Sequence, residues 1–367
     1  MQKPNIKEIL ERYQSGNCTE EERIWVENWY LSWLTGEFDL SEEELMADLT
    51  SVKNKLPAIQ RNTKIYYRVA AVAAAVLLIL GSAFYFFKND IGPKKDATYA
   101  KISPGSNKAV LTLSDGSQVV LDTTTNLASI DQYGVKITKD ADGKLIYTST
   151  STGKVVDAYN MVSTPKGGQY DIVLPDGTKV KLNAASTIRF PIIFSAGERN
   201  VEFEGEGYFE VTKDSKRPFR VKSGKQTVEV LGTQFNINCY KDEPQIRTTL
   251  LEGSILLKGA EEVLLRPGEQ GRTPHDAKKI HVMNVDVQTE VAWKNNLFFF
   301  ENEPIINIMR QISRWYDVDV VYQNDVSDKK VWGSITRFSE ISKVLEILEL
   351  TGNIHFNVEG RRITVMK

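Results

Sequence analysis

The feature that most constrains this 367-residue chain is a run of 19 residues without a charged side chain, Val69 to Phe87. At a rise of 1.5 Å per residue, a helix of this length spans about 28 Å, close to the roughly 30 Å of a bilayer's hydrocarbon core. Lys64, Arg68 and Lys88 flank the run, where their long side chains can reach the headgroups. The sequence therefore predicts one transmembrane helix over residues 69–87. It is no cleaved signal peptide, since 68 mostly polar residues precede it.

The orientation of this helix does not follow from the flanking charges. Residues 54–68 and residues 88–102 each hold four Lys or Arg, so the positive-inside rule favours neither side. An uncleaved internal anchor followed by a long C-terminal part favours a cytoplasmic N-terminus. We therefore expect a single-pass protein whose larger C-terminal part lies outside the cytoplasm.

The segment before this helix, residues 1–64, has a helical and acidic character, with eight Lys+Arg against twelve Asp+Glu. Capping boxes begin helices at Thr19 and Ser41. The first helix carries Trp25, Trp29 and Trp33 at intervals of four residues, and the second carries Leu45 and Leu49. The tryptophan stripe forms either the core of a small domain or, in part, a surface that docks a partner.

Beyond the predicted membrane helix, residues 88–100 form a polar tether, and residues 101–290 show short alternating strands separated by Gly, Asp and Asn turns. The pattern around Asp115-Gly116 returns around Asp176-Gly177, at an offset of 61 residues. Asp-Gly between alternating segments is a strong hairpin signal, and the repetition favours a stacked β architecture.

Residues 293–367 have the order β-α-β-β-α-β-β, with helices at 304–316 and 339–350. The predicted fold class is therefore multidomain. It consists of a small all-α domain (1–64), a transmembrane helix (69–87), a tether (88–100), a β-rich, stacked or solenoid-like domain (101–290) and a small α+β domain (293–367).

Few residues suggest chemistry. The formal charge of −2 argues against direct nucleic-acid binding, and the presence of only two cysteines and three histidines argues against a zinc site of nitrogen and sulfur ligands. No nucleotide-binding, metalloprotease or serine-hydrolase motif is present, so we expect no cofactor and no enzyme. The acidic run from Glu202 to Glu210 fits a solvated strand face, although paired carboxylates also serve glycosidases. A membrane-anchored glycan-binding or glycan-cleaving protein and an adhesive β-solenoid on a stalk are therefore the alternatives.

Seven segments resemble the core of the FecR-type transmembrane sigma-factor regulators. They are Thr164–Tyr170, Leu174–Asn183, Arg199–Val211, Arg217–Phe219, Val230–Ile237, Leu251–Gly253 and Arg266–Glu269. The region after Trp293 is similar to the C-terminal domain of this family in Bacteroidetes, which in turn resembles the short N-terminal signalling domain of secretins and TonB-dependent receptors. The N-terminal helices share the family's Trp-rich character.

This resemblance implies a function. The family relays a signal from the periplasmic signalling domain of a TonB-dependent outer-membrane receptor to an extracytoplasmic-function sigma factor bound by the cytoplasmic helices. Trp25, Trp29, Trp33, Leu45 and Leu49 would then bind the sigma factor, and the C-terminal region would lie in the periplasm.

Some family members also cut themselves between the Gly and Thr that correspond here to Gly232 and Thr233. The Thr233 hydroxyl would attack the Gly232 carbonyl and leave an ester that water opens. The alternative is that Gly232 forms a bulge and Thr233 is an ordinary strand residue.

Overall fold

The computed structural model describes residues 102–125, 127–149, 157–275 and 279–367, together with residues 12, 19, 21–24 and 26. The chain divides into two compact units, Met1–Gly92 and Pro93–Lys367. In the first unit, the predicted capping box at Thr19 is confirmed. The Glu22 amide donates to Thr19 Oγ1 at 3.3 Å, and the Thr19 amide donates to Glu22 Oε2 at 3.0 Å. Several predictions lie outside the described residues: Trp25, Trp29, Trp33, Leu45, Leu49, the membrane helix at 69–87 and the tether at 88–100.

The second unit begins with two large β-sheets. The eleven-stranded sheet contains β1 (Ser106–Asn107), β4 (Ile130–Gln132), β5 (Val135–Lys139), β6 (Leu145–Ser149), β8 (Gly168–Val173), β9 (Lys179–Leu182), β12 (Glu206–Glu210), β15 (Gln234–Asn238), β16 (Gln245–Glu252), β19 (Glu269–Pro274) and β20 (His281–Asn284). The nine-stranded sheet contains β2 (Ala109–Thr112), β3 (Gln118–Leu121), β7 (Tyr159–Ser163), β10 (Thr187–Pro191), β11 (Arg199–Glu204), β13 (Phe219–Ser223), β14 (Gln226–Val230), β17 (Ile255–Lys258) and β18 (Glu262–Leu265).

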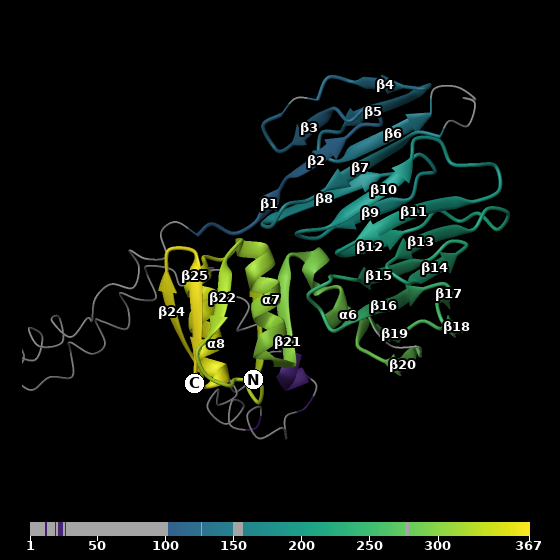
Figure 1. The fold of residues 1–367 in the computed structure, drawn as a ribbon. Coiled ribbons are helices and arrows are strands. Elements are labelled where there is room, and N and C mark those ends of the chain that lie inside the picture. The colour runs from purple at the N-terminus through teal and green to yellow at the C-terminus, as the bar shows by residue number, and fades with distance from the viewer. Residues whose placement is uncertain are drawn as a thin grey trace, which may run out of the picture. The chain divides into compact units, whose positions relative to one another are not determined.

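The chain passes repeatedly from one sheet to the other as it advances. Strands β8 and β9 lie in the eleven-stranded sheet, β10 and β11 in the nine-stranded sheet, and β12 returns to the first. Successive visits add strands in the same direction, so that the series runs from β4 to β20 along one sheet (Figure 1). Most neighbours in these two sheets are antiparallel, but β11 pairs with β13 in parallel, and β8 pairs in parallel with β6 and β1.

The predicted repeat forms two similar hairpins on opposite sheets. Gly116 and Gly177 adopt positive φ values of 86° and 82° at the equivalent turn positions, which glycine tolerates without a side-chain clash. In both turns the glycine amide donates to the leucine three residues earlier, Leu113 or Leu174, at 2.9 Å. The first hairpin joins β2 to β3 in the nine-stranded sheet, and the second joins β8 to β9 in the eleven-stranded sheet.

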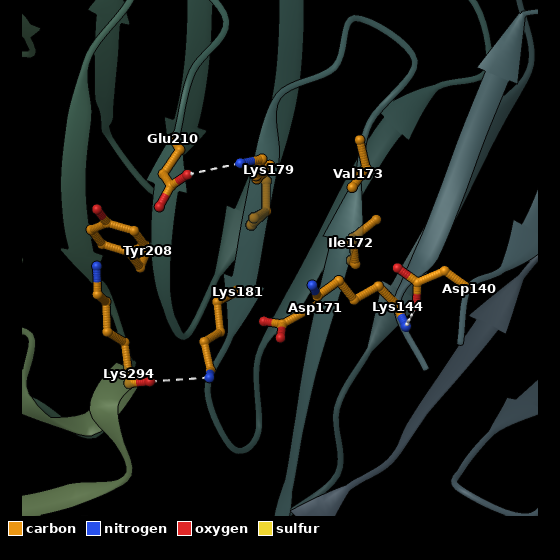
Figure 2. A pocket seen from close by; sticks show the side chains of 11 residues that line it. Asp140, Lys144, Asp171, Ile172, Val173, Lys179, Lys181, Tyr208, Glu210 and Lys294 are labelled. Atoms are coloured by element: carbon orange, nitrogen blue, oxygen red, sulfur yellow. Dashed lines mark hydrogen bonds and ion pairs between the residues drawn. The ribbon is translucent and has the colours of Figure 1, made fainter. Parts of the chain in front are cut away.

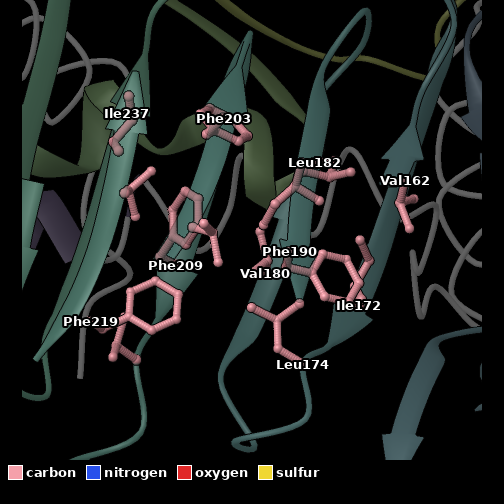
Figure 3. Close-up of a cluster of buried hydrophobic side chains, with 14 of the residues drawn as sticks. Val162, Ile172, Leu174, Val180, Leu182, Phe190, Phe203, Phe209, Phe219 and Ile237 are labelled. Carbon is pink, nitrogen blue, oxygen red and sulfur yellow. The ribbon is translucent and has the colours of Figure 1, made fainter. Parts of the chain in front are cut away.

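The inner faces of the two sheets enclose one apolar core (Figure 3). Strict alternation produces it: along β11, Val201 and Phe203 are buried while their neighbours are exposed. The rings of Phe209 and Phe235 stack with centroids 5.0 Å apart, and Phe203 meets Phe209 edge-on at 5.3 Å. Because this core is continuous along both sheets, it supplies a rigid support for the residues at their margins.

The C-terminal region, residues 287–367, has two helices between two small sheets (Figure 1). Its elements are α6 (Val287–Glu290), η1 (Ala292–Asn295), β21 (Leu297–Pro304), α7 (Ile305–Tyr316), β22 (Asp319–Tyr322), β23 (Lys330–Thr336), α8 (Ile341–Gly352), β24 (His355–Glu359) and β25 (Arg362–Met366). Helix α7 contacts β21 and β22, and α8 contacts β23 and β24. The helices therefore form a middle layer with a core of their own.

The fold-class prediction is wrong as a whole. The described part of the second unit is mostly β, with four short helices, α6, η1, α7 and α8, and the described residues 12, 21–24 and 26 of the first unit are helical. No all-α domain is present in the described part of the chain. None of its helices is both long and apolar enough to span a bilayer. The physical reason is that apolar residues in most of the described chain alternate with period two, which selects strands.

Candidate functional site

The most unusual chemistry of the described residues lies where the eleven-stranded sheet meets the C-terminal region. The sheet contributes polar side chains from β8, from the ends of β9 and β15, and from the start of β12. The C-terminal region contributes α7 and the turn after β23. We call this contact the junction and define it by the following residues: Gln169, Asn183, Glu206, Asn236, Tyr240, Trp293, Arg314, Trp315 and Arg337.

A backbone break places Glu206 at the junction. Gly205 has a φ of 100°, and a Cβ built on it would lie 2.4 Å from Ser186 Oγ, so no other residue fits without a shift. The Ser186 hydroxyl fills this space, accepting from the Glu206 amide at 2.9 Å. The chain therefore leaves β11 in one sheet and enters β12 in the other within a single residue.

The Glu206 carboxylate is held by three amide side chains. Asn183 donates to Oε2 at 2.7 Å, and Asn236 and Asn238 donate to Oε1 at 3.2 Å each. Burial nevertheless raises the pKa of Glu206 above its ordinary value, against the opposing effects of Arg247 and the amides. Glu206 is thus a carboxylate kept in place by neutral donors rather than by an ion pair.

Arg337, which follows β23, crosses the junction and is 2% exposed. Its guanidinium donates to Asn183 Oδ1 at 2.7 Å, to the Trp293 carbonyl at 3.1 Å and, more weakly, to Gln169 Oε1 at 3.4 Å. It also lies over the Trp315 ring, 3.8 Å from the centroid. Burial lowers the pKa of Arg337 to about 10.

Arg314 of α7 makes the second crossing of the junction. It donates to both carboxylate oxygens of Asp242, at 2.9 and 2.8 Å, and to Glu243 Oε1 at 2.6 Å. Its guanidinium lies 3.9 Å from the centroid of the Tyr240 ring. Arg310, one turn earlier, reaches Glu243 Oε2 at 3.4 Å. Helix α7 is therefore attached through charges to the segment after β15.

Close backbone approach completes the junction around Trp315, which is fully buried. A Cβ on Gly105 would lie 2.6 Å from the Trp315 ring. The Gly167 amide donates to the Arg314 carbonyl at 2.7 Å, and the Trp315 indole donates to the Arg337 carbonyl at 2.6 Å. Gly105 and Gly167 thus allow α7 to approach the sheet closely.

An open pocket of about 400 Å³ lies beside the junction on the outer face of the eleven-stranded sheet (Figure 2). Its charged lining mixes both signs: Asp140, Lys144, Asp171, Lys179, Lys181, Glu210 and Lys294. Lys294 Nζ lies 3.7 Å from the centroid of the Tyr208 ring, and Lys181 Nζ donates to the Lys294 carbonyl at 3.1 Å. Burial raises the pKa of Asp171 and lowers that of Lys181. These are cross-strand pairs of a sheet surface, without a nucleophile and base in contact.

The acidic run does not form the single strand face that was predicted. Glu202 and Glu204 are exposed on β11 of the nine-stranded sheet, whereas Glu206 and Glu210 belong to β12 of the eleven-stranded sheet. Glu202 forms a surface ion pair with Arg189 at 3.3 Å. The four glutamates therefore do not share one strand face.

The predicted self-cleavage residues lie just before β15. Gly232 allows close packing, because a Cβ there would lie 2.7 Å from the Lys213 Cα. Thr233 is 4% exposed, and its hydroxyl donates to the Ser254 carbonyl at 3.1 Å. A register irregularity follows at Gln234. A base in contact with the Thr233 hydroxyl is not found among the described residues, so self-cleavage stays a prediction.

Residues able to hold a metal or cofactor do not cluster in the part of the chain that the structure describes. No group of three His, Cys, Asp or Glu side chains there has metal-binding geometry. His275 Nε2 contacts the Glu243 carbonyl at 3.0 Å, and His281 and His355 are exposed. Burial raises the pKa of Cys239 to about 12, so its thiol is unreactive at neutral pH.

The sequence-based reasoning missed the arginines of the junction. Arg314 lies within the helix predicted at 304–316 and Arg337 just before the one predicted at 339–350, but neither arginine is marked by a sequence pattern. Strand and helix periodicity report which face is apolar and cannot identify a buried cation. The short polar side chains at strand ends, Asn183 and Asn238, were the available signal, because such residues are otherwise depleted in strands.

Comparison with known proteins identifies the two parts that meet at the junction. The family model described as "FecR protein" matches residues 160–256, and the one described as "FecR, C-terminal" matches residues 297–365. Two crystal structures of a "putative anti-sigma factor" from Parabacteroides distasonis ATCC 8503 are similar to the chain at 29% identity. The 2.50 Å structure has a TM-score of 0.54 and covers 57% of this chain and 99% of its own; the 1.65 Å structure has 0.53, 56% and 98%. No functionally curated protein matches the chain.

Proposed function

The chain belongs to the FecR family of sigma-factor regulators, and from this premise we propose that it relays a signal from a TonB-dependent outer-membrane receptor to an extracytoplasmic-function sigma factor. In this proposal residues 1–64 bind the sigma factor in the cytoplasm through Trp25, Trp29, Trp33, Leu45 and Leu49. The FecR and C-terminal regions lie on the periplasmic side of the cytoplasmic membrane and receive the signal.

The junction is the observation that carries this proposal. In this proposal a receptor domain binds the C-terminal region. Its binding reaches the membrane side of the protein only if it also changes the FecR region. Arg314 and Arg337 connect the two regions through buried, charge-assisted hydrogen bonds, which are directional and therefore sensitive to small displacements. A shift of α7 or of the turn after β23 would be transmitted directly to β9, β12 and β15.

The test uses the tagged full-length protein, coexpressed with a candidate sigma factor, and a sigma-dependent reporter. We expect the sigma factor to copurify with the wild-type chain. Replacing Trp29 by Ala should weaken this binding by about 2 kcal/mol, as interface tryptophans do. Replacing Arg337 by Ala should leave copurification intact while altering the receptor-dependent reporter response. Absence of any copurifying sigma factor would contradict the proposal.

A matched variant separates signalling from folding. Arg362 is an exposed arginine of β25 in the same C-terminal region and is not one of the junction residues. The Arg362→Ala variant should therefore retain both copurification and the reporter response. Equal losses in both arginine variants would indicate a general defect rather than a role of the junction.

A further inference from the structure

A second feature of the same boundary is a small cleft rich in carboxylates, which shares Glu206 and Trp293 with the junction. It lies between the outer side of β21 and the strands β12, β15 and β16, and α6 lines it as well. We call it the acidic cleft and define it by Glu206, Asn238, Glu290, Phe299, Glu301 and Glu303. Its volume of about 60 Å³ accommodates an amino or guanidino group with a few waters.

The acidic cleft contains buried polar atoms without a partner. Asn238 is 4% exposed and donates its amide to Glu206, but its Oδ1 accepts no hydrogen bond. Thr289 Oγ1, which also lines the cleft, is buried and unpartnered. Buried polar atoms are rarely left unsatisfied, so two in one cleft indicate a missing hydrogen-bond donor.

The charge of the acidic cleft specifies what kind of donor fits. Four glutamates line it, and Arg247 is its one cation among the described lining residues. Arg247 interacts at a distance with Glu206, Glu290 and Glu303 but forms no ion pair within 4.0 Å among the described residues. The negative surplus is therefore not neutralised locally, and it favours a cation.

An apolar platform adjoins the acidic cleft on the outer face of β21 and β23. Leu297, Phe299 and Trp332 are 38%, 40% and 54% exposed. Phe299 pairs with Ser334, which places Trp332 on the same face two residues away. An extended chain laid on this face can therefore contact apolar side chains while a basic side chain enters the cleft.

We propose that the acidic cleft receives a lysine or arginine side chain from an extended segment of a partner protein, whose neighbouring apolar side chains contact Leu297, Phe299 and Trp332. This inference rests on the proposed function, since that partner is the protein that signals to the C-terminal region. The cation would donate to Asn238 Oδ1 and to the carboxylates of Glu290 and Glu301. Because Glu206 lies in both the cleft and the junction, occupancy of the cleft acts directly on the junction.

The test titrates the purified full-length protein with two blocked pentapeptides, Phe-Val-Lys-Val-Phe and Phe-Val-Glu-Val-Phe, by calorimetry. We expect the lysine peptide to bind at least tenfold more tightly than the glutamate peptide, with an affinity that falls as salt rises. The double variant Glu290→Gln, Glu301→Gln should lose about tenfold of the lysine-peptide affinity. Equal affinity for both peptides, or binding of neither, would overturn the inference.

A control and a separate readout complete the design. Glu262 is exposed on β18 of the other sheet, so Glu262→Gln removes a charge without touching the cleft and should bind the lysine peptide as the wild type does. If Glu262→Gln lost as much lysine-peptide affinity as the double variant, the effect would come from the overall charge of the protein, and the site would be refuted. Copurification of the sigma factor is measured on the same samples. Its absence contradicts the proposed function, while a failed titration contradicts only the cleft.

Discussion

Removing the contact between Arg337 and Asn183 should uncouple the two halves of the junction. Hydrogen bonds to a charged group contribute about 1.5–3 kcal/mol each, and Arg337 makes two with good geometry, at 2.7 and 3.1 Å. Two effects oppose this gain. Burial disfavours the cation, as its lowered pKa indicates, and the Nε atom has no partner, which costs about 1–3 kcal/mol. The net loss expected for Arg337→Ala is therefore about 2 kcal/mol.

A double-mutant cycle isolates the pair from these opposing terms. The assay is equilibrium urea unfolding of the full-length protein, followed by tryptophan fluorescence, since Trp293 and Trp315 lie at the junction. We expect the losses in Arg337→Ala and Asn183→Ala to be less than additive, with a coupling energy of about 1.5–3 kcal/mol.

The control cycle pairs Asn183→Ala with Arg362→Ala, which should be additive within about 0.5 kcal/mol. A coupling below about 0.5 kcal/mol for Arg337 and Asn183 would refute the reasoning. The hydrogen bond between them would then only offset the cost of removing its two partners from water, with no net gain in the free energy of unfolding.

Three further predictions concern individual side chains. Folding raises the pKa of Glu206 above its ordinary 4.5, so the native state binds this proton more tightly and loses stability as the pH rises past 4.5. The Glu206→Gln variant lacks this proton, so its unfolding free energy minus that of the wild type should increase with pH in urea titrations. A difference that does not change with pH would contradict this. Arg199 pairs with Asp176 at 2.8 Å with both side chains buried, so Arg199→Ala should destabilise by about 3–5 kcal/mol in thermal unfolding, and a loss below 1 kcal/mol would show that Asp176 finds another partner. If the chain cuts itself, a denaturing gel should resolve two fragments that divide at Gly232 and Thr233, absent in Thr233→Ala and insensitive to protease inhibitors; one intact band after long incubation would exclude it.

Local patterns predicted the C-terminal elements closely. The expected helix at 304–316 is α7, Ile305–Tyr316, and its inner-face residues Ile308, Ile312 and Trp315 are buried. The helix expected at 339–350 is α8, Ile341–Gly352. Each of these elements depends on a periodicity and an end signal within a dozen residues, and such information is fully contained in a short window. The position of the helices between two sheets is not local, because it depends on strands far apart in the sequence.

The division of the acidic run illustrates where period-two reasoning fails. From Val201 to Val211 the alternation of apolar and acidic residues is compatible with one continuous strand. Gly205 interrupts it with a left-handed backbone that the alternation does not report. The consequence is that Glu204 is exposed on one sheet, whereas Glu206 contacts three asparagines on the other.

The composition of the junction also has a functional consequence. A contact made of apolar side chains alone would respond to the shape of a partner but hardly to its charge. Glu206 is instead held by neutral amides, one of which, Asn183, also accepts from Arg337. A cation arriving in the acidic cleft should favour the ionised form of Glu206, draw its carboxylate away from Asn183, and so alter the bond that connects the sheet to the C-terminal region. The same carboxylate whose burial is unfavourable at rest is thus the group best placed to respond when a charged partner binds.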